Sequence, residues 1–260
     1  MPRLGFLFGG VSSQSMKIRA RLTNWVVSPA RRNAYETVPG KPGVADFGSD
    51  SAERIITIRC GVMPQRNFAA LVSVLDGVAE WLNPEDGVKQ LMLDDVPDRY
   101  YKARLTEAVD CERLLRTAGA FDLQFICPDP FAYALSDEAA AFGSTGSHTF
   151  TRNTGNTTSE PVYSMWGDIA SGSGRHIKIT TNGEELYIVG PLSAGETLVV
   201  DTGLVTAKVI DSTGETLRNG LANMRELNFP VLHQGGNEIV IETENASFTE
   251  LEIKANSRWR

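Results

Sequence analysis

The clearest hydrophobic pattern in the chain lies between residues 67 and 82. Its apolar side chains recur at i, i+3, i+4 and i+7, the spacing that gives an α-helix one apolar face. Pro64 precedes this run and Asn83-Pro84 follows it, so the sequence predicts a helix from Asn67 to Leu82 that covers a sheet. The predicted buried stripe consists of Phe68, Leu71, Val72, Leu75, Val78, Ala79 and Leu82.

The rest of the first half has the alternation and the β-branched content of strands. Residues 30–50 are rich in Gly, Pro and Asp, which predicts a long hairpin with its tip between Arg31 and Asp50. A turn is predicted at Val96-Pro97-Asp98. Pro128 and Pro130 end the last strand, because proline lacks the N–H group that a central strand donates. The predicted strands cover residues 4–13, 16–28, 53–63, 89–98, 99–115 and 118–135.

The composition changes after Leu135. Residues 136–161 are small and polar, with few large apolar side chains after Phe150, which predicts a domain boundary early in this stretch. From Val162 onward the chain consists of short alternating segments at a spacing typical of a β-sandwich or barrel. We therefore expect two domains, residues 1–140 and 145–260. The second contains predicted strands at residues 161–169, 175–181, 185–190, 197–202, 207–213, 237–243 and 248–255, with turns at Asn182-Gly183, Ala194-Gly195, Thr213-Gly214 and Gly235-Gly236.

The charge balance and the apolar content exclude several classes of protein. The chain has 25 basic and 32 acidic residues and a net charge of −7, whereas a protein that grips DNA by its phosphates is usually basic. Such a surface would let DNA pass without binding it. No run reaches the roughly 18 apolar residues that a membrane helix requires. The N-terminal apolar run is too short for a secretory signal, so we expect the chain to fold in a cytoplasm.

The residues that could carry chemistry form no recognisable site. The fragment Pro39-Gly40-Lys41-Pro42 lacks the upstream glycine and the Ser/Thr of a phosphate-binding loop. The sequence contains no HxH or HExxH pattern and no CxxC pair, which makes a metal site or a disulfide framework unexpected. We predict no catalytic, cofactor-binding or metal-binding residue, no cofactor and no enzyme activity. The residues considered are His148, His176 and His233, and Cys60, Cys111 and Cys127 as buried free thiols.

Two weaker alternatives concern carboxylates and aromatic rings. Asp94, Asp95 and Asp98 could form the acid pair of a wall hydrolase, or simply a solvated turn. Aromatic side chains of the second half could stack on a sugar or fill the core of the sandwich. These aromatic residues are Tyr163, Trp166, Tyr187, Phe229, Phe248 and Trp259.

Several segments, taken in order, resemble the siphophage distal tail (Dit) proteins. Asp95 to Ala103, within LMLDDVPDRYYKARL, is similar to the family's D-x-P-D-R-Y-Y-x-A strand, and Phe121 to Tyr133 to its F-x-L-x-F-x-C-x-D-P-F-x-Y strand. Upstream, GFLFGGVSS, RRNAYETVPGKPGVADFG and ERIITIRCGV resemble its first strand, its V-P-G-x-x-G hairpin and the strand before its helix. The C-terminal GGNEIVIETENASFTELEIKANSRW resembles the family's closing segment.

The resemblance implies a mainly β fold: a β-sandwich with one packed helix and a long hairpin, then a C-terminal galectin-like β-sandwich. It implies that residues 1–140 pack head to tail into a homohexameric ring between the tail tube protein and the tail-tip or baseplate hub protein. The ring would surround the DNA channel at the tail tip of the virion. No specific nucleic acid binding and no membrane are expected.

Some members of the family carry a long arm in the second domain that holds receptor-binding proteins. The short turns here leave no room for one. The alternative function is a carbohydrate-binding module that contacts the host cell wall.

Overall fold

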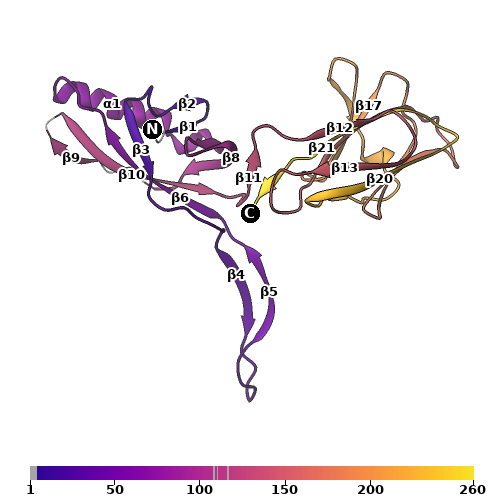
Figure 1. The fold of residues 1–260 in the computed structure, drawn as a ribbon, viewed down its shortest axis with the longest axis horizontal. Helices are drawn as coiled ribbons and strands as arrows, with labels where there is room; N and C mark the ends of the chain where they lie inside the picture. The colour runs from indigo at the N-terminus through magenta and orange to yellow at the C-terminus, as the bar shows by residue number, and fades with distance from the viewer. Residues whose placement is uncertain (1–4, 108, 110, 116) are drawn as a thin grey trace. The chain divides into compact units, whose positions relative to one another are not determined.

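The computed structural model describes residues 5–107, 109, 111–115 and 117–260, and the fold is mainly β (Figure 1). The chain divides into two compact units, Met1–Leu135 with Arg260, and Ser136–Trp259. Leu4, Ala108 and Asp110, which the sequence analysis placed in strands, lie outside the described residues. The expected mainly β fold with one packed helix and a long hairpin is confirmed.

The first unit is built on a sheet with the hydrogen-bonded strand order β2-β1-β7-β8-β10-β6-β3. Strand β9 adds to β10, β11 adds to β8, and β4 and β5 form a separate pair. The strands are β1 Phe6–Phe8, β2 Val11–Ser12, β3 Ile18–Leu22, β4 Arg31–Glu36, β5 Ala45–Ser51, β6 Arg54–Val62, β7 Lys89–Leu93, β8 Val96–Leu105, β9 Glu112–Leu115, β10 Ala118–Cys127 and β11 Ala132–Ala134, and the helices are α1 Phe68–Trp81 and the short 3-10 helix η1 Pro84–Asp86.

Two details of this sheet differ from the prediction. Strands β7 and β8 pair Leu93 with Val96, so the turn is Asp94-Asp95 and the predicted corner at Val96-Pro97-Asp98 is wrong. Pro97 is tolerated because it lies at the start of β8, before Arg99, where pairing with β11 begins. The predicted strand at residues 99–115 is two elements, since β8 ends at Leu105 and β9 begins at Glu112.

Helix α1 packs on the sheet with only part of the predicted stripe, since Leu71, Val78 and Leu82 are buried and the other four residues are not. Its first turn is capped by Asn67, whose Oδ1 accepts a hydrogen bond from the Ala70 N–H at 2.8 Å. The Trp81 indole is buried against Phe6 and donates to the Phe8 carbonyl at 3.0 Å. Burying this large ring turns the helix, which leaves Phe68 and Val72 exposed and Leu75 only half-buried. The residues of the helix that are buried are Leu71, Val78 and Trp81.

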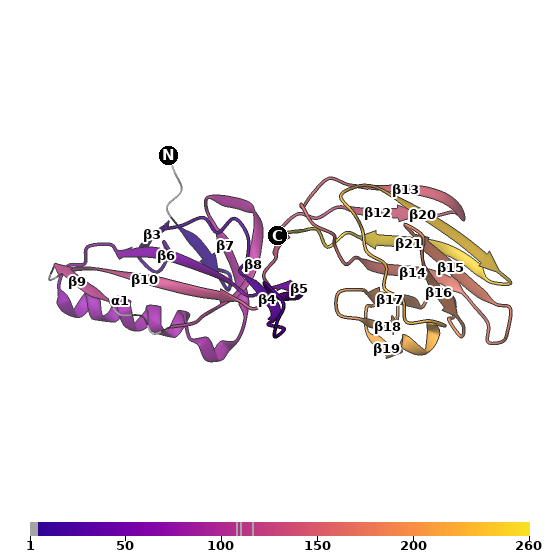
Figure 2. The same ribbon diagram turned by 90° about the horizontal axis from the view of Figure 1, so that it is seen from below.

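The second unit is a β-sandwich of two antiparallel sheets (Figure 2). One sheet has the order β12-β21-β14-β17-β18-β19 and the other β13-β20-β15-β16. The elements are β12 Ala139–Phe142, β13 Gly146–Arg152, β14 Val162–Asp168, β15 His176–Thr181, β16 Glu184–Val189, β17 Thr197–Asp201, β18 Thr206–Ile210, β19 Thr216–Asn219, η2 Leu221–Asn223, β20 Gly235–Glu244, β21 Ser247–Lys254 and β22 Arg258–Trp259.

The core of the sandwich is filled by inward residues of both sheets, as strand alternation requires. Tyr163 is fully buried, and its hydroxyl lies 2.9 Å from the Thr181 hydroxyl across the core. Asn182-Gly183 forms the predicted turn between β15 and β16, with both residues at positive φ. Gly235-Gly236, predicted as a turn, instead begins β20.

The small polar stretch at residues 136–161 is also more ordered than its composition suggests. It contains β12, which pairs with β21, and β13, which pairs with β20. The galectin-like character of the sandwich and the predicted domain limits, 1–140 and 145–260, stay predictions.

Candidate assembly surface

Of the carboxylates considered for acid–base chemistry, Asp94 and Asp95 form the β7–β8 turn and Asp98 lies in β8. Asp94 is half-buried and Asp95 is exposed. Asp98 accepts two hydrogen bonds from Arg99, at 3.0 and 2.9 Å, and these hold the pKa of Asp98 below its ordinary value. A general acid in glycoside hydrolysis needs a raised pKa, so Asp98 does not suit that role.

The histidines and cysteines are dispersed. His148, on β13, contacts the Ser144 carbonyl; His176, on β15, stacks on Tyr187 of β16; and His233 lies in the segment before β20. The thiols of Cys60 and Cys127 are buried, and Cys111 is half-buried. Within the part of the chain that the structure describes, no three His, Cys, Asp or Glu side chains gather into a metal site. No described helix is long and apolar enough to cross a membrane.

Tyr187, a candidate sugar platform, is occupied by protein groups. The His176 ring stacks on it at 4.3 Å between ring centroids, and the Arg225 guanidinium lies 4.9 Å from its centroid. Trp166 is half-buried on β14. Tyr163, by contrast, is a core residue. Nothing in the placement of these rings favours the carbohydrate alternative.

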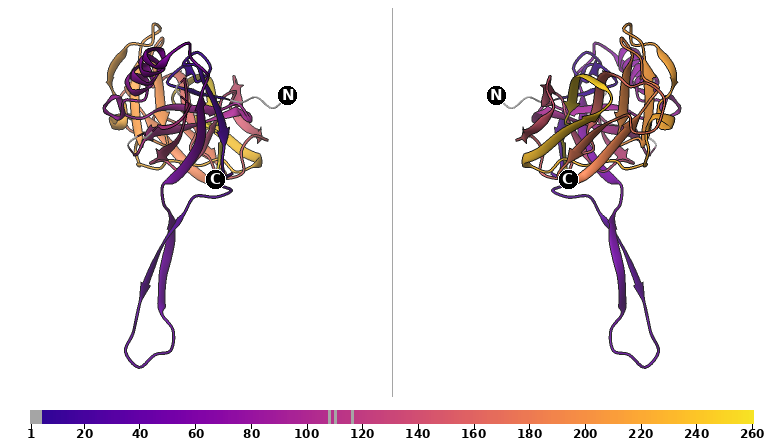
Figure 3. Two further views of the ribbon diagram at one scale, coloured as in Figure 1. Left: turned by 90° about the vertical axis from the view of Figure 1, so that its left-hand side faces the viewer. Right: turned by 90° about the vertical axis from the view of Figure 1, so that its right-hand side faces the viewer.

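The β4–β5 hairpin, here called the arm, is the most exposed element of the first unit. Its strands pair with each other and with no other described strand, and it extends away from the sheet (Figures 1 and 3). Its side chains are exposed, apart from partial burial at the start and end of β5. Four of them are large and apolar: Tyr35, Val38, Val44 and Phe47, the last 68% exposed.

The root of the arm is held firmly. The Ala52 N–H donates to the Ala30 carbonyl at 2.8 Å. Arg54, only 3% exposed, donates to the Val26 carbonyl at 2.7 Å and to the Pro130 carbonyl at 2.9 Å. The arm therefore projects from a fixed base, while its own side chains have no core to fill.

A second unsatisfied apolar surface lies beside α1. It is an open groove of about 480 Å³, here called the α1 groove. Its floor is buried, and its rim includes half-buried Leu75 and exposed Ala79. Glu107 is the one charged group among its described lining residues. The lining consists of Leu75, Val78, Ala79, Leu82, Pro84, Leu105, Thr106, Glu107, Val109, Cys111 and Phe121.

The groove was not predicted from the sequence, because the periodicity puts Leu75 and Ala79 in the buried stripe of the helix. Apolar periodicity shows that a helix has an apolar face but not whether that face is covered by the same chain. Trp81 is the residue that could have indicated which side of the helix is covered. Its large ring favours burial against the sheet, and its N–H needs a hydrogen-bond acceptor there.

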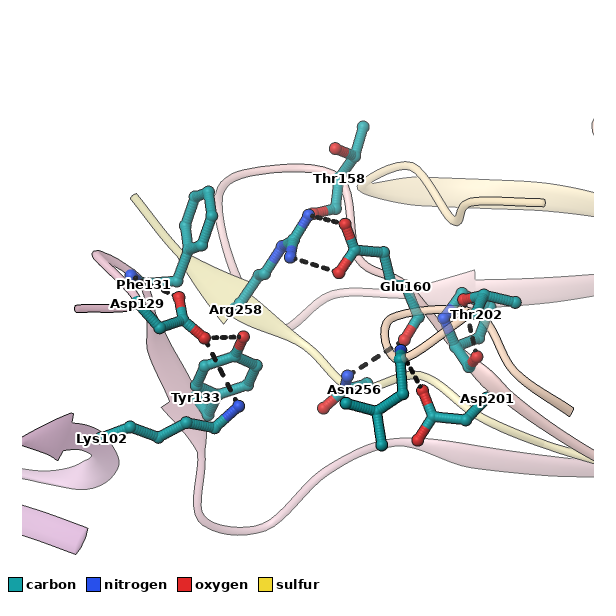
Figure 4. A network of polar contacts seen from close by, with 12 residues as sticks. Lys102, Asp129, Phe131, Tyr133, Thr158, Glu160, Asp201, Thr202, Asn256 and Arg258 are labelled. Carbon is teal, nitrogen blue, oxygen red and sulfur yellow. Dashed lines mark hydrogen bonds and ion pairs between the residues drawn. The ribbon is translucent and has the colours of Figure 1, made fainter. Parts of the chain in front are cut away.

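In contrast, the side chains of Glu160, Asn256 and Arg258, in the second unit, are paired within the protein. The Arg258 guanidinium contacts both carboxylate oxygens of Glu160, at 2.7 and 2.9 Å, and donates to the Thr158 carbonyl (Figure 4). Asn256 donates to the Glu160 carbonyl at 3.0 Å. Such bidentate pairs fix geometry and leave little for a ligand to bind.

A smaller cluster belongs to the first unit. Asp129 accepts from the Tyr133 hydroxyl at 2.6 Å and lies 3.4 Å from the Lys102 ammonium (Figure 4). The same ammonium lies 3.9 Å from the centroid of the Tyr133 ring. These contacts hold the segment between β10 and β11 and resemble no catalytic arrangement.

Comparison with known proteins finds a matching protein family and solved structures of similar fold. The family described as the phage tail protein RIFT-related domain matches residues 11–127. The crystal structure of the Dit protein of phage SPP1, described as a paradigm of the hub adsorption apparatus in phages that infect Gram-positive bacteria, is similar over 99% of both chains, with a TM-score of 0.74 and 14% identity. A chain of the phage p2 baseplate in its activated conformation with Sr is similar over 97% of this chain and 99% of its own, with a TM-score of 0.50 and 9% identity. No sequence among the curated proteins matches.

The expected resemblance to siphophage distal tail proteins is thus confirmed. The match to the SPP1 protein extends over both units, whereas the family match is confined to the first. Residues 11–127 match the phage tail protein RIFT-related domain, and the chain as a whole has the fold of the SPP1 Dit protein.

Proposed function

We propose that this chain is a structural subunit, not an enzyme, that closes head to tail into a homohexameric ring at the distal end of the phage tail. The ring joins the tail tube protein to the tail-tip or baseplate hub protein and surrounds the DNA channel. It is assembled in the host cytoplasm and resides in the virion. The first unit makes the ring contacts and the second, a galectin-like sandwich, faces outward.

The exposed arm carries this proposal. A head-to-tail ring needs two different surfaces on each subunit, one that reaches out and one that receives. An isolated two-stranded hairpin is marginally stable in water, and apolar side chains exposed along it favour contact with another surface. The apolar residues of the arm are of this kind, and its root is fixed by Arg54.

The test is the oligomeric state of the full chain with and without the arm. Because the Ala52 N–H already donates to the Ala30 carbonyl, a Gly-Gly turn can replace residues 31–51 without disturbing the sheet. Light scattering and negative-stain imaging should show rings of six subunits for the parent and folded monomers for the arm deletion.

The two proteins should melt at similar temperatures, because the arm contributes no core. A parent that stays monomeric at tens of micromolar would contradict the ring, although weak rings dissociate on dilution. Rings formed equally well without the arm would contradict its role.

A further inference from the structure

The α1 groove and the tip of the arm are matched in size and in character. The tip, residues 37–44, has the sequence TVPGKPGV and presents Val38 and Val44 to solvent. We propose that the α1 groove receives this tip from a second copy of the chain. The proposal rests on the proposed ring, because it names the surface on the neighbour that the arm contacts.

The first argument is apolar complementarity. The groove is lined mainly by aliphatic side chains, with Phe121 and Val78 buried at its floor. Its volume of about 480 Å³ lies in the range of roughly 300–1,000 Å³ of pockets that enclose small ligands, so it can take a few side chains of a turn. Two valines and two prolines of the tip supply apolar groups of that size.

The second argument is charge. Lys41 lies at the apex of the tip, where its N–H donates to the Val38 carbonyl at 3.1 Å, and residues 37–44 contain no acidic group. The groove offers Glu107 on its lining, and no described lining residue is basic. Neither Lys41 nor Glu107 has an ion-pair partner among the described residues. Opposite charges in this arrangement would favour and orient the contact.

The third argument is preorganisation. Pro39 and Pro42 restrict the tip, and Gly40 and Gly43 take the positive φ that its turn requires. A tip already held in its turn loses less conformational entropy on docking than a flexible loop. The arm leads away from α1 in its own unit (Figure 1), which leaves the tip available to the groove of another copy.

The native thiol of Cys111, on the groove lining, provides a direct test. A Lys41→Cys variant of the full chain, treated with a short bis-maleimide, should give a ladder of covalent species up to six chains on denaturing gels. Cys60 and Cys127 should not react, because burial raises their pKa values to about 12 and shields them from the reagent.

Two control variants define the background of this experiment. Lys41→Cys combined with Cys111→Ser should lose the ladder. Ser212→Cys, which places a thiol on an exposed turn of the second unit, should give no ladder.

A second variant blocks the groove without touching the arm. Ala79→Trp adds a large ring at the exposed rim and should weaken ring formation at least tenfold, with the melting temperature unchanged. Ala69→Trp is the matched control, because Ala69 is also exposed on α1 and is not among the residues that line the groove. It should assemble like the parent.

The outcomes separate the two proposals. Rings in the parent, with no ladder from Lys41→Cys and normal assembly of Ala79→Trp, would overturn the groove as the receiving surface and leave the ring intact. A parent that forms no rings would overturn both. Equal loss of rings in Ala79→Trp and Ala69→Trp would also count against the groove, because the effect would then be general to the helix.

Discussion

The arm and the β15–β16 hairpin are both antiparallel strand pairs closed by glycine-containing turns, yet they bury very different parts of themselves. Along β15, every second side chain is buried in the sandwich core, whereas all six residues of β4 are exposed. The β15–β16 hairpin is completed by β20 and by a core within its own unit.

The difference shows where each hairpin finds its stability. In β15–β16, buried and solvent-facing residues alternate, so the sequence specifies which face packs inward. The core that covers this face belongs to the same unit. The arm has apolar side chains but no face that packs on a core of its own unit. Its side chains are therefore one of the two surfaces that a contact needs. We infer that the other surface lies on a second molecule.

The largest expected effect separates two phenylalanines. Phe150→Ala in β13 removes a ring that is 4% exposed and should lower the free energy of unfolding by about 3–5 kcal/mol. Phe47→Ala on the arm should change it by less than about 0.5 kcal/mol, since Phe47 is 68% exposed, and should weaken ring formation instead. Urea denaturation and light scattering of both variants measure the two effects. A large loss of monomer stability in Phe47→Ala would mean that the arm has a core after all.

A somewhat smaller effect is expected at Arg152, which is fully buried at the end of β13. Its guanidinium donates to three carbonyls, those of His233, Thr154 and Thr157, at 3.1, 3.0 and 2.6 Å. Arg152→Met removes these three donations, although the His233 carbonyl still accepts from the Asn237 amide at 3.0 Å, and should destabilise the second unit by about 3 kcal/mol. Arg175→Met, at an exposed position, is the matched control and should unfold like the parent.

A modest pH effect is expected from Glu196, whose carboxylate is paired with Arg218 at 2.6 Å. Hydrogen bonds from Arg218, and then from the Ser193 N–H, lower the pKa of Glu196 from 4.5 to about 2. Because the folded pKa is depressed, this stabilisation is fully present above about pH 4.5 and is lost as the pH falls toward 2.

Both side chains of this pair are partly exposed, so water screens it, and Glu196→Gln should cost at most about 1 kcal/mol at pH 7. The difference from the parent should shrink below pH 4.5 in thermal melts. Glu250→Gln, an exposed carboxylate, should show no such trend. A difference that grows on acidification would contradict the assignment.

The last and smallest expected effect is the affinity of the chain for duplex DNA. With a net charge of −7, the chain should bind duplex DNA more weakly than about 10⁻⁴ M at physiological salt, the weak end of non-specific binding. Fluorescence anisotropy with a labelled duplex measures this. Tight binding that weakens steeply with salt would reveal a basic surface that the net charge conceals.

Sequence patterns predicted the elements whose signals are local. The helix limits followed from Asn67 and Pro84, the β15–β16 turn from Asn182-Gly183, and the arm from its glycines and prolines. Each of these depends on backbone preferences of a few adjacent residues, which the sequence states directly.

The predictions that were wrong concern features that depend on residues far away in the sequence. The face of α1 depends on Phe6 and Phe8, which receive the Trp81 ring. Strand β12 has the sequence AAAF, with no alternation of its own, and forms because β21 offers a free edge. The α1 groove was missed for a related reason, since whether an apolar residue is covered depends on the tertiary structure and not on its own sequence neighbours.

The hydrogen-bonded ladder of the arm contains a β-bulge, which affects how its exposed edges can pair with other strands. Its register shifts between Asn33 and Tyr35, and Gly48 opposite takes a φ of +109° while its N–H donates to Asp46. Such a bulge bends a strand and interrupts its row of free backbone groups. Chains with a long, flat strand edge and exposed apolar side chains tend to stack into fibrils. A bent arm tipped with two prolines is a poor template for stacking, so these features protect the exposed hairpin against aggregation through its edges.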